Sequence, residues 1–146
     1  MTRYVDTSIL AAYYCPEPLS EQAEQRLRAL DPPVISWLTD VELHSALAKK
    51  VRRHELTEPA ARRVQELFRA HAQQELYRVI PVVQRDFRQA RQWMEKRECP
   101  LRTLDALHLA IAHRHALTVL TADHVMARAG EAFDLDAELV QADPSP

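Results

Sequence analysis

The fold is decided by residues 103–123, which read TLDALHLAIAHRHALTVLTAD. The first part, residues 103–115, is apolar nearly all round, a pattern that predicts a buried helix. The second part, residues 117–120, is a short β-like run that leads to the acid Asp123. Helices that separate short buried strands are typical of βαβ units, and such units build parallel sheets.

The same alternation extends outward through the rest of the chain. Strands are expected at residues 3–6, 33–36, 77–82 and 117–120, with a weak edge strand at 133–140. Helices are expected at residues 8–14, 19–30, 40–54, 58–75, 84–97, 103–115 and 123–129. Pro81 indicates that the third strand ends there or lies at an edge. The sequence therefore predicts an α/β fold in three layers, with helices on both faces of a central parallel sheet of four to five short strands.

Length and composition favour one domain. The chain has 146 residues, of which 47% are hydrophobic, and this suits a single core. We expect one domain over residues 1–141 and a flexible C-terminal tail over residues 142–146. No apolar run approaches the roughly 20 residues that cross a bilayer, and the N-terminus shows no signal-peptide pattern, so a cytoplasmic protein is expected. Cys15 and Cys99 are expected to be reduced thiols, with a disulfide as the alternative.

Charge and glycine content exclude several classes of site. The formal net charge of −2 argues against a strongly basic nucleic-acid scaffold, although a basic rim can coexist with an acidic centre. The single glycine, Gly130, excludes a P-loop and a dinucleotide fingerprint, which both need several glycines. The histidine spacing does not favour zinc. Several short arginine stretches predict either a solvated helix face, which is favoured, or a rim for an RNA backbone: Arg52-Arg53, Arg62-Arg63 and Arg85/Arg88/Arg91.

Four acids stand where an apolar segment stops: Asp6, Glu42, Asp105 and Asp123. Sites in open parallel sheets form outside the carboxyl ends of the strands, and Asp6 and Asp123 follow two such ends. If the fold brings the four carboxylates together, their repulsion requires a hard divalent cation such as Mg²⁺ or Mn²⁺. A site of this kind points to phosphodiester chemistry.

Three of these acids also have a structural interpretation of equal or greater weight. Asp6 and Asp123 each precede an expected helix, and either could be a turn or N-cap residue. Glu42 completes the pattern Thr39-Asp40-Val41-Glu42, which fits a capping box, and on that motif alone the structural interpretation is favoured.

Asp105 is the acid for which function is favoured over structure. It lies in the apolar helix, and a buried carboxylate is tolerated mainly when it is paired or binds a metal. Its structural partner would be His108, three residues along the helix. Thr103, two residues before Asp105, could cap the helix or support the site with its hydroxyl.

Four sequence pieces resemble the PIN domain family, and most closely its VapC-type toxins. They are YVDTS at residues 4–8, LTDVEL at 38–43, TLDALHLA at 103–110 and LTAD at 120–123. Their order and spacing, together with the chain length, extend the resemblance over almost the whole sequence. The resemblance implies that the family's acidic quartet maps onto Asp6, Glu42, Asp105 and Asp123. Its supporting hydroxyls map onto Thr7 or Ser8 and onto Thr121.

The resemblance also implies a chemistry and its partners. Asp6, Asp105 and Asp123 would hold Mg²⁺ or Mn²⁺, and Glu42 would orient or deprotonate the water that attacks an RNA phosphodiester. Many relatives carry a further acid where this chain has Val125, which puts a site of five carboxylates in doubt. The implied protein is an endoribonuclease toxin, held as a homodimer and inhibited by an antitoxin. A housekeeping PIN nuclease without an antitoxin and a non-catalytic binding module are the alternatives.

Overall fold

Five short parallel strands form one sheet, in the order β3-β2-β1-β4-β5, in the computed structural model, which describes residues 1–144. The strands are β1 (Tyr4–Val5), β2 (Val34–Ser36), β3 (Arg78–Ile80), β4 (Val119–Thr121) and β5 (Ala137–Leu139). Tyr4 on the central strand is in register with Val34 on one side and Val119 on the other. The predicted parallel sheet is confirmed, and β3, which ends directly before Pro81, lies at an edge.

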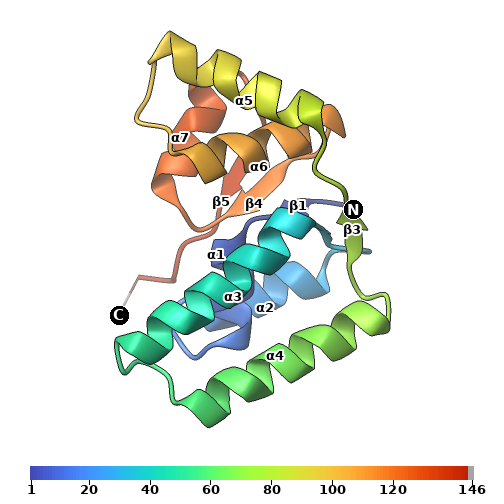
Figure 1. Cartoon of the computed structure of the whole chain (residues 1–146), viewed down its shortest axis with the longest axis vertical. Helices are drawn as coiled ribbons and strands as arrows, with labels where there is room; N and C mark the ends of the chain where they lie inside the picture. The colour runs from blue at the N-terminus through green and yellow to red at the C-terminus, as the bar shows by residue number, and fades with distance from the viewer. Residues whose placement is uncertain (145–146) are drawn as a thin grey trace.

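Helices cover both faces of this sheet (Figure 1). They are α1 (Thr7–Tyr14), α2 (Ser20–Arg28), α3 (Trp37–Arg52), α4 (Glu58–Gln73), α5 (Gln84–Lys96), α6 (Thr103–Arg114) and α7 (His124–Ala132). Side chains alternate between the two faces of a strand, so each strand feeds two cores. Val5 and Leu120 pack in the core under α1–α4, whereas their neighbours Tyr4 and Val119 pack in the core under α5–α7. The three predicted layers are therefore present.

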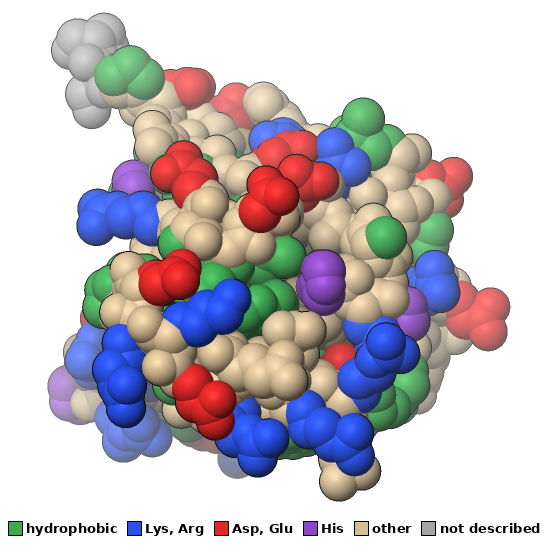
Figure 2. All heavy atoms as spheres, turned by 90° about the horizontal axis from the view of Figure 1, so that it is seen from above, with side chains coloured by type: hydrophobic (Ala, Val, Ile, Leu, Met, Phe, Trp, Pro, Cys, Tyr) green, Lys and Arg blue, Asp and Glu red, His purple; other side chains and the backbone are tan. Residues whose placement is uncertain are grey.

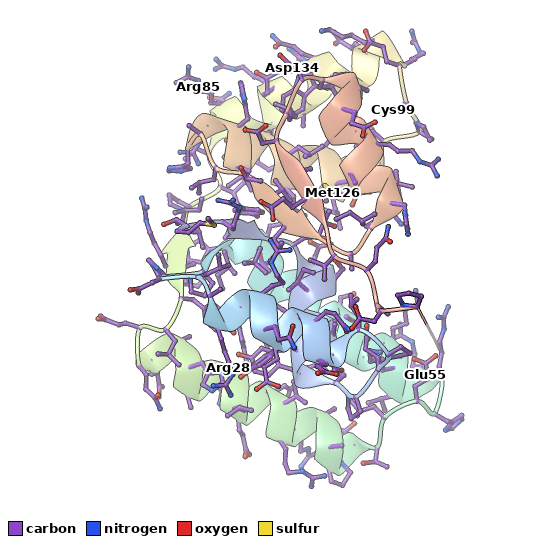
Figure 3. The ribbon with its side chains drawn as sticks, turned by 180° about the vertical axis from the view of Figure 1, so that it is seen from behind. Arg28, Glu55, Arg85, Cys99, Met126 and Asp134 are labelled. Carbon is purple, nitrogen blue, oxygen red and sulfur yellow. The ribbon has the colours of Figure 1, made fainter. Side chains whose placement is uncertain are left out.

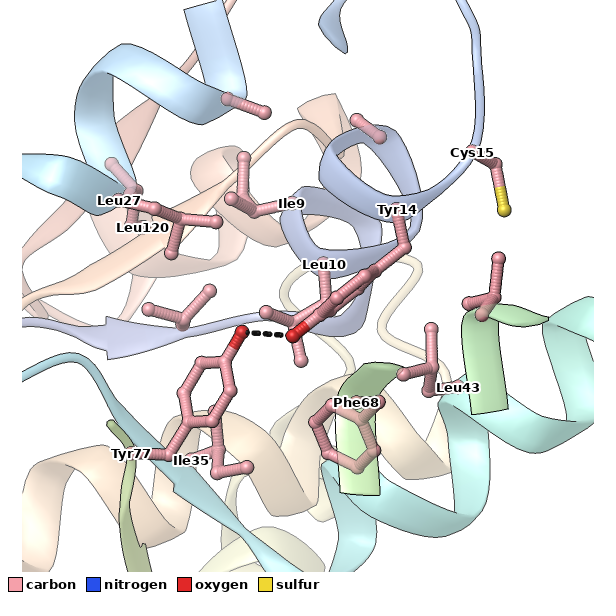
Figure 4. Packing of buried hydrophobic residues seen from close by; sticks show 14 of the residues in the cluster. Ile9, Leu10, Tyr14, Cys15, Leu27, Ile35, Leu43, Phe68, Tyr77 and Leu120 are labelled. Atoms are coloured by element: carbon pink, nitrogen blue, oxygen red, sulfur yellow. Dashed lines mark hydrogen bonds between the residues drawn. The ribbon is translucent and has the colours of Figure 1, made fainter. Parts of the chain in front are cut away.

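The core under α1–α4 contains a polar pair among its apolar side chains (Figure 4). The hydroxyls of Tyr14 and Tyr77 lie 2.6 Å apart, and Tyr14 also bonds to Nδ1 of His71 at 2.7 Å. Burial raises the pKa of Tyr77 to about 12, so its phenol stays protonated at neutral pH. These bonds satisfy hydroxyls that would otherwise destabilise a buried site.

Helix α3 begins at Trp37, three residues earlier than the sequence pattern predicts. The hydroxyl of Thr39 accepts a hydrogen bond from the backbone N–H of Ser36 at 3.2 Å, so the helix start is fixed upstream of Asp40. The predicted capping box through Glu42 is therefore wrong, and the Glu42 carboxylate is free for other contacts.

Residues 142–144 and the two cysteines lie outside the helices and strands. Residues 142–144 of the predicted tail form neither helix nor strand, and residues 145–146 lie outside the described residues. The carboxylate of Asp143 accepts a hydrogen bond from the Gln22 amide at 2.9 Å. Cys15 and Cys99 are free thiols, and Figure 3 shows Cys99 in the segment before α6. In residues 1–144, no helix has both the length and the apolar character needed to span a membrane.

A buried ion pair fastens α5 to α6. Asp86 is 1% exposed, and its carboxylate accepts hydrogen bonds from Arg114 at 2.7 and 3.1 Å and from the Val83 backbone N–H at 2.9 Å. Arg114→Ala should lower the free energy of unfolding by about 3 kcal/mol, because it leaves a buried carboxylate without its counterion. Urea unfolding followed by circular dichroism measures this change.

The matched control for this prediction is Arg88→Ala on the same side of the molecule. Arg88 is an exposed residue of α5, and surface substitutions of this type change stability by about 0.5 kcal/mol or less. Equal unfolding midpoints for the two variants would contradict the stabilising role of the Asp86–Arg114 pair.

Five helices are followed by non-glycine residues in the left-handed backbone region, with φ between 53° and 58°: His54, Glu75, Arg97, Ala116 and Asp134. This conformation is costly for residues with a Cβ, and helices commonly place glycine there. Ala116→Gly should therefore raise the free energy of unfolding by about 1 kcal/mol. Thermal and urea denaturation measure the gain. Ala70→Gly, inside α4, is the control and should lower stability by about 1 kcal/mol; a loss for both variants would contradict the argument.

Candidate active site

The four acids singled out in the sequence line one cavity of about 690 Å³. Asp6 follows β1, and Asp123 follows β4 by two residues. Glu42 is contributed by α3, which begins directly after β2, and Asp105 by the first turn of α6. The carboxyl ends of three neighbouring parallel strands meet at one edge, so this placement follows from the topology.

Asp6 and Asp123 are N-caps and cavity residues at the same time. The Asp6 carboxylate accepts hydrogen bonds from the Thr7 backbone N–H at 2.8 Å and from the Ser8 hydroxyl at 2.7 Å. The Asp123 carboxylate accepts the Val125 backbone N–H at 2.8 Å through Oδ1, which leaves Oδ2 for the cavity. The structural and functional interpretations of these two acids are thus compatible with each other.

Most of the predicted hydroxyls bind an acid directly. Thr7 donates to Glu42 at 3.1 Å, and Thr121 donates to Asp6 at 2.9 Å. The Ser8 hydroxyl also accepts the Ala122 backbone N–H at 3.0 Å, which joins the segment after β4 to the start of α1. Thr103 lines the cavity, but among the described contacts its hydroxyl bonds to none of the four acids.

Arg102 is the partner of two of the acids. Its Nε donates to Oδ2 of Asp105 at 2.7 Å, and its Nη2 donates to Oδ2 of Asp123. These bonds correct the expectation that His108 is the structural partner of Asp105. The sequence signal for Arg102 was its position three residues before Asp105, at the expected start of the helix, where the two side chains are close enough to meet.

His108 instead bonds to Glu42. It is fully buried, and its Nε2 donates to Oε1 of Glu42, while a hydrogen bond of 2.6 Å joins its Nδ1 to the Tyr4 hydroxyl. Burial is the main reason why the pKa of Tyr4 is raised, so its hydroxyl keeps its proton. The Tyr4 oxygen in turn lies 2.8 Å from the Ser36 hydroxyl. A continuous buried chain of hydrogen bonds therefore runs from the end of β2 to the Glu42 carboxylate.

The electrostatic environments of Glu42 and Asp105 differ. Burial alone would raise the pKa of Glu42, but hydrogen bonds from His108 and Thr7 and the charge of Arg102 lower this pKa below its ordinary value. Burial also raises the pKa of Asp105, and the charges of Asp123 and Asp6 raise it further, against the opposing effect of Arg102. Glu42 is thus favoured as a carboxylate, while burial and two neighbouring acids disfavour the charged form of Asp105 in spite of Arg102, an effect that a further cation would reduce.

The acids suit a hard divalent cation by their chemistry. Within residues 1–144, no three His, Cys, Asp or Glu side chains are already grouped around one ion position. Oxygens of Asp105, Asp123 and Glu42 instead accept hydrogen bonds from Arg102 and His108. The Arg102 guanidinium thus places a positive charge beside carboxylate oxygens. A set of ligands made only of oxygen atoms is what Mg²⁺ and Mn²⁺ prefer.

One wall of the cavity is a single face of α3. It carries Glu42 and, at helical spacing from it, Leu38, Ser45, Ala46 and Lys49. Lys49 was not predicted as a site residue, although the sequence holds a signal for it. It lies seven residues after Glu42, which is two helical turns, so both side chains belong to the same face of α3. The cavity therefore combines acids with two cationic side chains, Lys49 and Arg102.

The face formed by α5–α7 carries further positive charge. Figure 2 shows Lys and Arg side chains gathered along one margin of this face. Helix α5 contributes exposed Arg85, Arg88 and Arg91. The predicted solvated helix face is consistent with this exposure, and the same side chains are accessible to a nucleic-acid backbone.

Comparison with known proteins identifies the fold. The family model described as PIN domain matches residues 3–132. No curated protein matches the sequence. The solved structure of VapC20 from Mycobacterium tuberculosis, described as a toxin that cleaves the sarcin–ricin loop, is similar with a TM-score of 0.70 and 20% identity. That match covers 89% of this chain and 95% of VapC20.

Two solved complexes are also similar to this chain. VapBC2 from Rickettsia felis, bound to a promoter DNA fragment, matches with a TM-score of 0.69 and 14% identity, over 97% of this chain and 100% of that one. FitAcB from Neisseria gonorrhoeae matches with a TM-score of 0.67 and 21% identity, over 94% of this chain and 96% of that one. At such identities the likeness is one of fold.

Proposed function

Since this chain belongs to the PIN domain family, we propose that it is a Mg²⁺- or Mn²⁺-dependent endoribonuclease that hydrolyses RNA phosphodiester bonds. One observation carries the proposal: Asp6, Glu42, Asp105 and Asp123, which are dispersed through the sequence, line one cavity at the carboxyl end of the sheet. Such a concentration of carboxylates is unfavourable for stability and useful for binding a cation.

The acids differ in their proposed roles. Asp6 and Asp105 would supply the principal ligands, and Asp123 would bind the ion directly or through water. When bound, the ion would neutralise the negative charge that builds on the phosphoryl oxygens. The hydroxyls of Ser8 and Thr121 hold the Asp6 carboxylate in place, which fixes the orientation of one ligand.

Glu42 is the proposed base. Its lowered pKa keeps it ionised at neutral pH, and bonds from His108 and Thr7 fix one of its oxygens. Glu42 would take a proton from the attacking water as the water oxygen forms its bond to phosphorus. The P–O bond to the leaving ribose oxygen then breaks, and that oxygen takes up a proton from solvent.

We further propose that the protein is the toxin of a VapBC-type pair. The support is the similarity in fold to VapC20, which is described as a toxin, and to a solved toxin–antitoxin complex from Klebsiella pneumoniae. An antitoxin partner, a homodimer and a cytoplasmic location belong to this proposal, as does a single nuclease domain over residues 1–141 with a tail over residues 142–146. A housekeeping RNA-processing nuclease would share the chemistry and lack the antitoxin.

The activity is tested by incubating the purified chain with structured RNA in Mg²⁺, in Mn²⁺ and in EDTA. We expect discrete cleavage products with either metal and none with EDTA, detected by mapping new RNA 5′ ends. Binding of RNA without cleavage under all three conditions would support the non-catalytic alternative instead.

The toxin role needs a separate test in cells. The chain is expressed alone and together with a small neighbouring reading frame, and growth is followed. Growth arrest by the chain alone, relieved by the neighbour, is expected of a toxin. Unimpaired growth in both cultures, together with RNA cleavage in vitro, would favour the housekeeping nuclease.

A further inference from the structure

Arg102 reaches across the mouth of the acidic cavity. Its side chain is 66% exposed, whereas the side chains of its partners Asp105 and Asp123 are 12% and 24% exposed. The guanidinium thus lies on the solvent side of two largely buried carboxylates. These are two of the three acids to which the proposed function assigns the divalent ion.

The Arg102 side chain has no capping role that would explain its position. Arg102 precedes α6 as its N-cap, but its side chain makes no cap hydrogen bond. Its backbone carbonyl accepts a hydrogen bond from the N–H of Ala106 at 3.0 Å, and the carbonyl of any residue at this position could do the same. The contacts of the side chain are therefore directed at the acids and away from the helix backbone.

The contacts of Arg102 are of a kind that a divalent ion can replace. A guanidinium carries one charge at hydrogen-bond distance, whereas Mg²⁺ carries two charges and approaches oxygen to about 2.1 Å. Exposed ion pairs are individually weak, so a long side chain that is two-thirds exposed can move away at small cost. The released guanidinium would stay at the mouth of the cavity, because the Arg102 backbone directly precedes α6, whose residues Leu104 and Asp105 line the cavity.

We propose that Arg102 is an internal counterion of the acidic site: it neutralises Asp105 and Asp123 in the metal-free chain, yields to the divalent ion, and then binds a phosphate of the RNA. This inference rests on the proposed nuclease function. The planar guanidinium presents a pair of N–H donors that matches two phosphate oxygens as well as it matches a carboxylate. One side chain would thereby link metal binding to substrate binding.

The test uses opposite effects of one substitution on two affinities. Binding of MnCl₂ alone is measured by isothermal titration calorimetry for the unmodified chain and for Arg102→Gln. We expect binding about fivefold tighter in Arg102→Gln, because the ion no longer competes with two ion pairs. RNA binding is measured by fluorescence anisotropy in saturating Mn²⁺, with Glu42→Gln added to every chain to suppress cleavage. Here Arg102→Gln should bind RNA about fivefold more weakly.

Two further variants sharpen the test. Arg102→Lys keeps the charge but lacks the paired donors, so its Mn²⁺ affinity should lie between those of the other two chains. Arg28→Gln removes a charge from the exposed surface of α2 (Figure 3) and should change neither affinity. Far-ultraviolet circular dichroism of each variant checks that the fold is intact.

Each outcome separates this inference from the function on which it rests. If the unmodified chain binds Mn²⁺ and Arg102→Gln binds it equally or more weakly, the counterion role is wrong and the nuclease proposal stands. If Mn²⁺ binding tightens while RNA affinity is unchanged, the phosphate-binding role is wrong. If no chain binds Mn²⁺, the proposed function fails and the inference fails with it.

Discussion

Asp6→Asn and Asp105→Asn should each lower metal-dependent RNA cleavage by at least about a hundredfold. Each change replaces an anionic ligand with a neutral amide, which binds hard cations far less well, and loss of even an indirect support of a metal site costs about 10- to 100-fold. Asparagine preserves the shape of the side chain and can cap a helix, so α1 should still begin at Thr7 in Asp6→Asn.

The measurement is the initial rate of RNA cleavage in Mn²⁺, with calorimetric Mn²⁺ binding as a second readout. Asp40→Asn is the matched control, because Asp40 is a neighbour of Glu42 on α3 that pairs with His44 at 3.3 Å and lies outside the cavity lining. It should retain full activity. Full activity in Asp6→Asn and Asp105→Asn as well would end the proposal that these acids hold a catalytic ion.

The second large effect is expected for His108→Ala, which should lower the free energy of unfolding by about 3 kcal/mol. This substitution opens a cavity in the fully buried interior and leaves the Tyr4 hydroxyl and the Glu42 carboxylate without their shared partner. It should also lower cleavage about 10- to 100-fold, because Glu42 loses the donor that orients it. Urea unfolding and cleavage kinetics measure the two effects separately.

Two variants test whether His108 positions Glu42 or only fills space. His108→Gln offers one amide donor to Glu42 and should recover part of the cleavage rate lost in His108→Ala. His113→Ala, at the exposed end of the same helix, should leave the cleavage rate unchanged. A His108→Ala chain that is folded and cleaves RNA at the full rate would show that the histidine has no positioning role.

The fold was largely predictable because its signals are local. Short β-like runs alternate with helical stretches, and an acid follows a strand end in the two cases of Asp6 and Asp123. The carboxyl ends of parallel strands share one edge of a sheet, so the approach of Asp6 and Asp123 could be expected without coordinates. The inclusion of Glu42 and Asp105 was implied only by the family resemblance. The start of α3 was predicted wrongly because two overlapping cap patterns compete, one beginning at Ser36 and the other at Thr39.

The side-chain partners in the site were harder to predict, because they depend on packing between distant segments. His108 could reach either Asp105 on its own helix or Glu42 on α3, and the way in which α3 and α6 meet at the carboxyl end of the sheet decides for Glu42. The buried chain from Ser36 through Tyr4 to His108 joins residues that are 32 and 104 positions apart in sequence. No local pattern encodes such contacts.

The absence of glycine after the helices, where five residues are held at positive φ, has a practical consequence. Each of these positions is a place where the backbone can be relaxed at a residue outside the lining of the acidic cavity, and the gains at separated sites should add. A chain with several such replacements should unfold at a higher temperature than the unmodified chain. Substitutions that weaken the interior, His108→Ala above all, could then be assayed in a molecule that is still folded at the temperature of the assay.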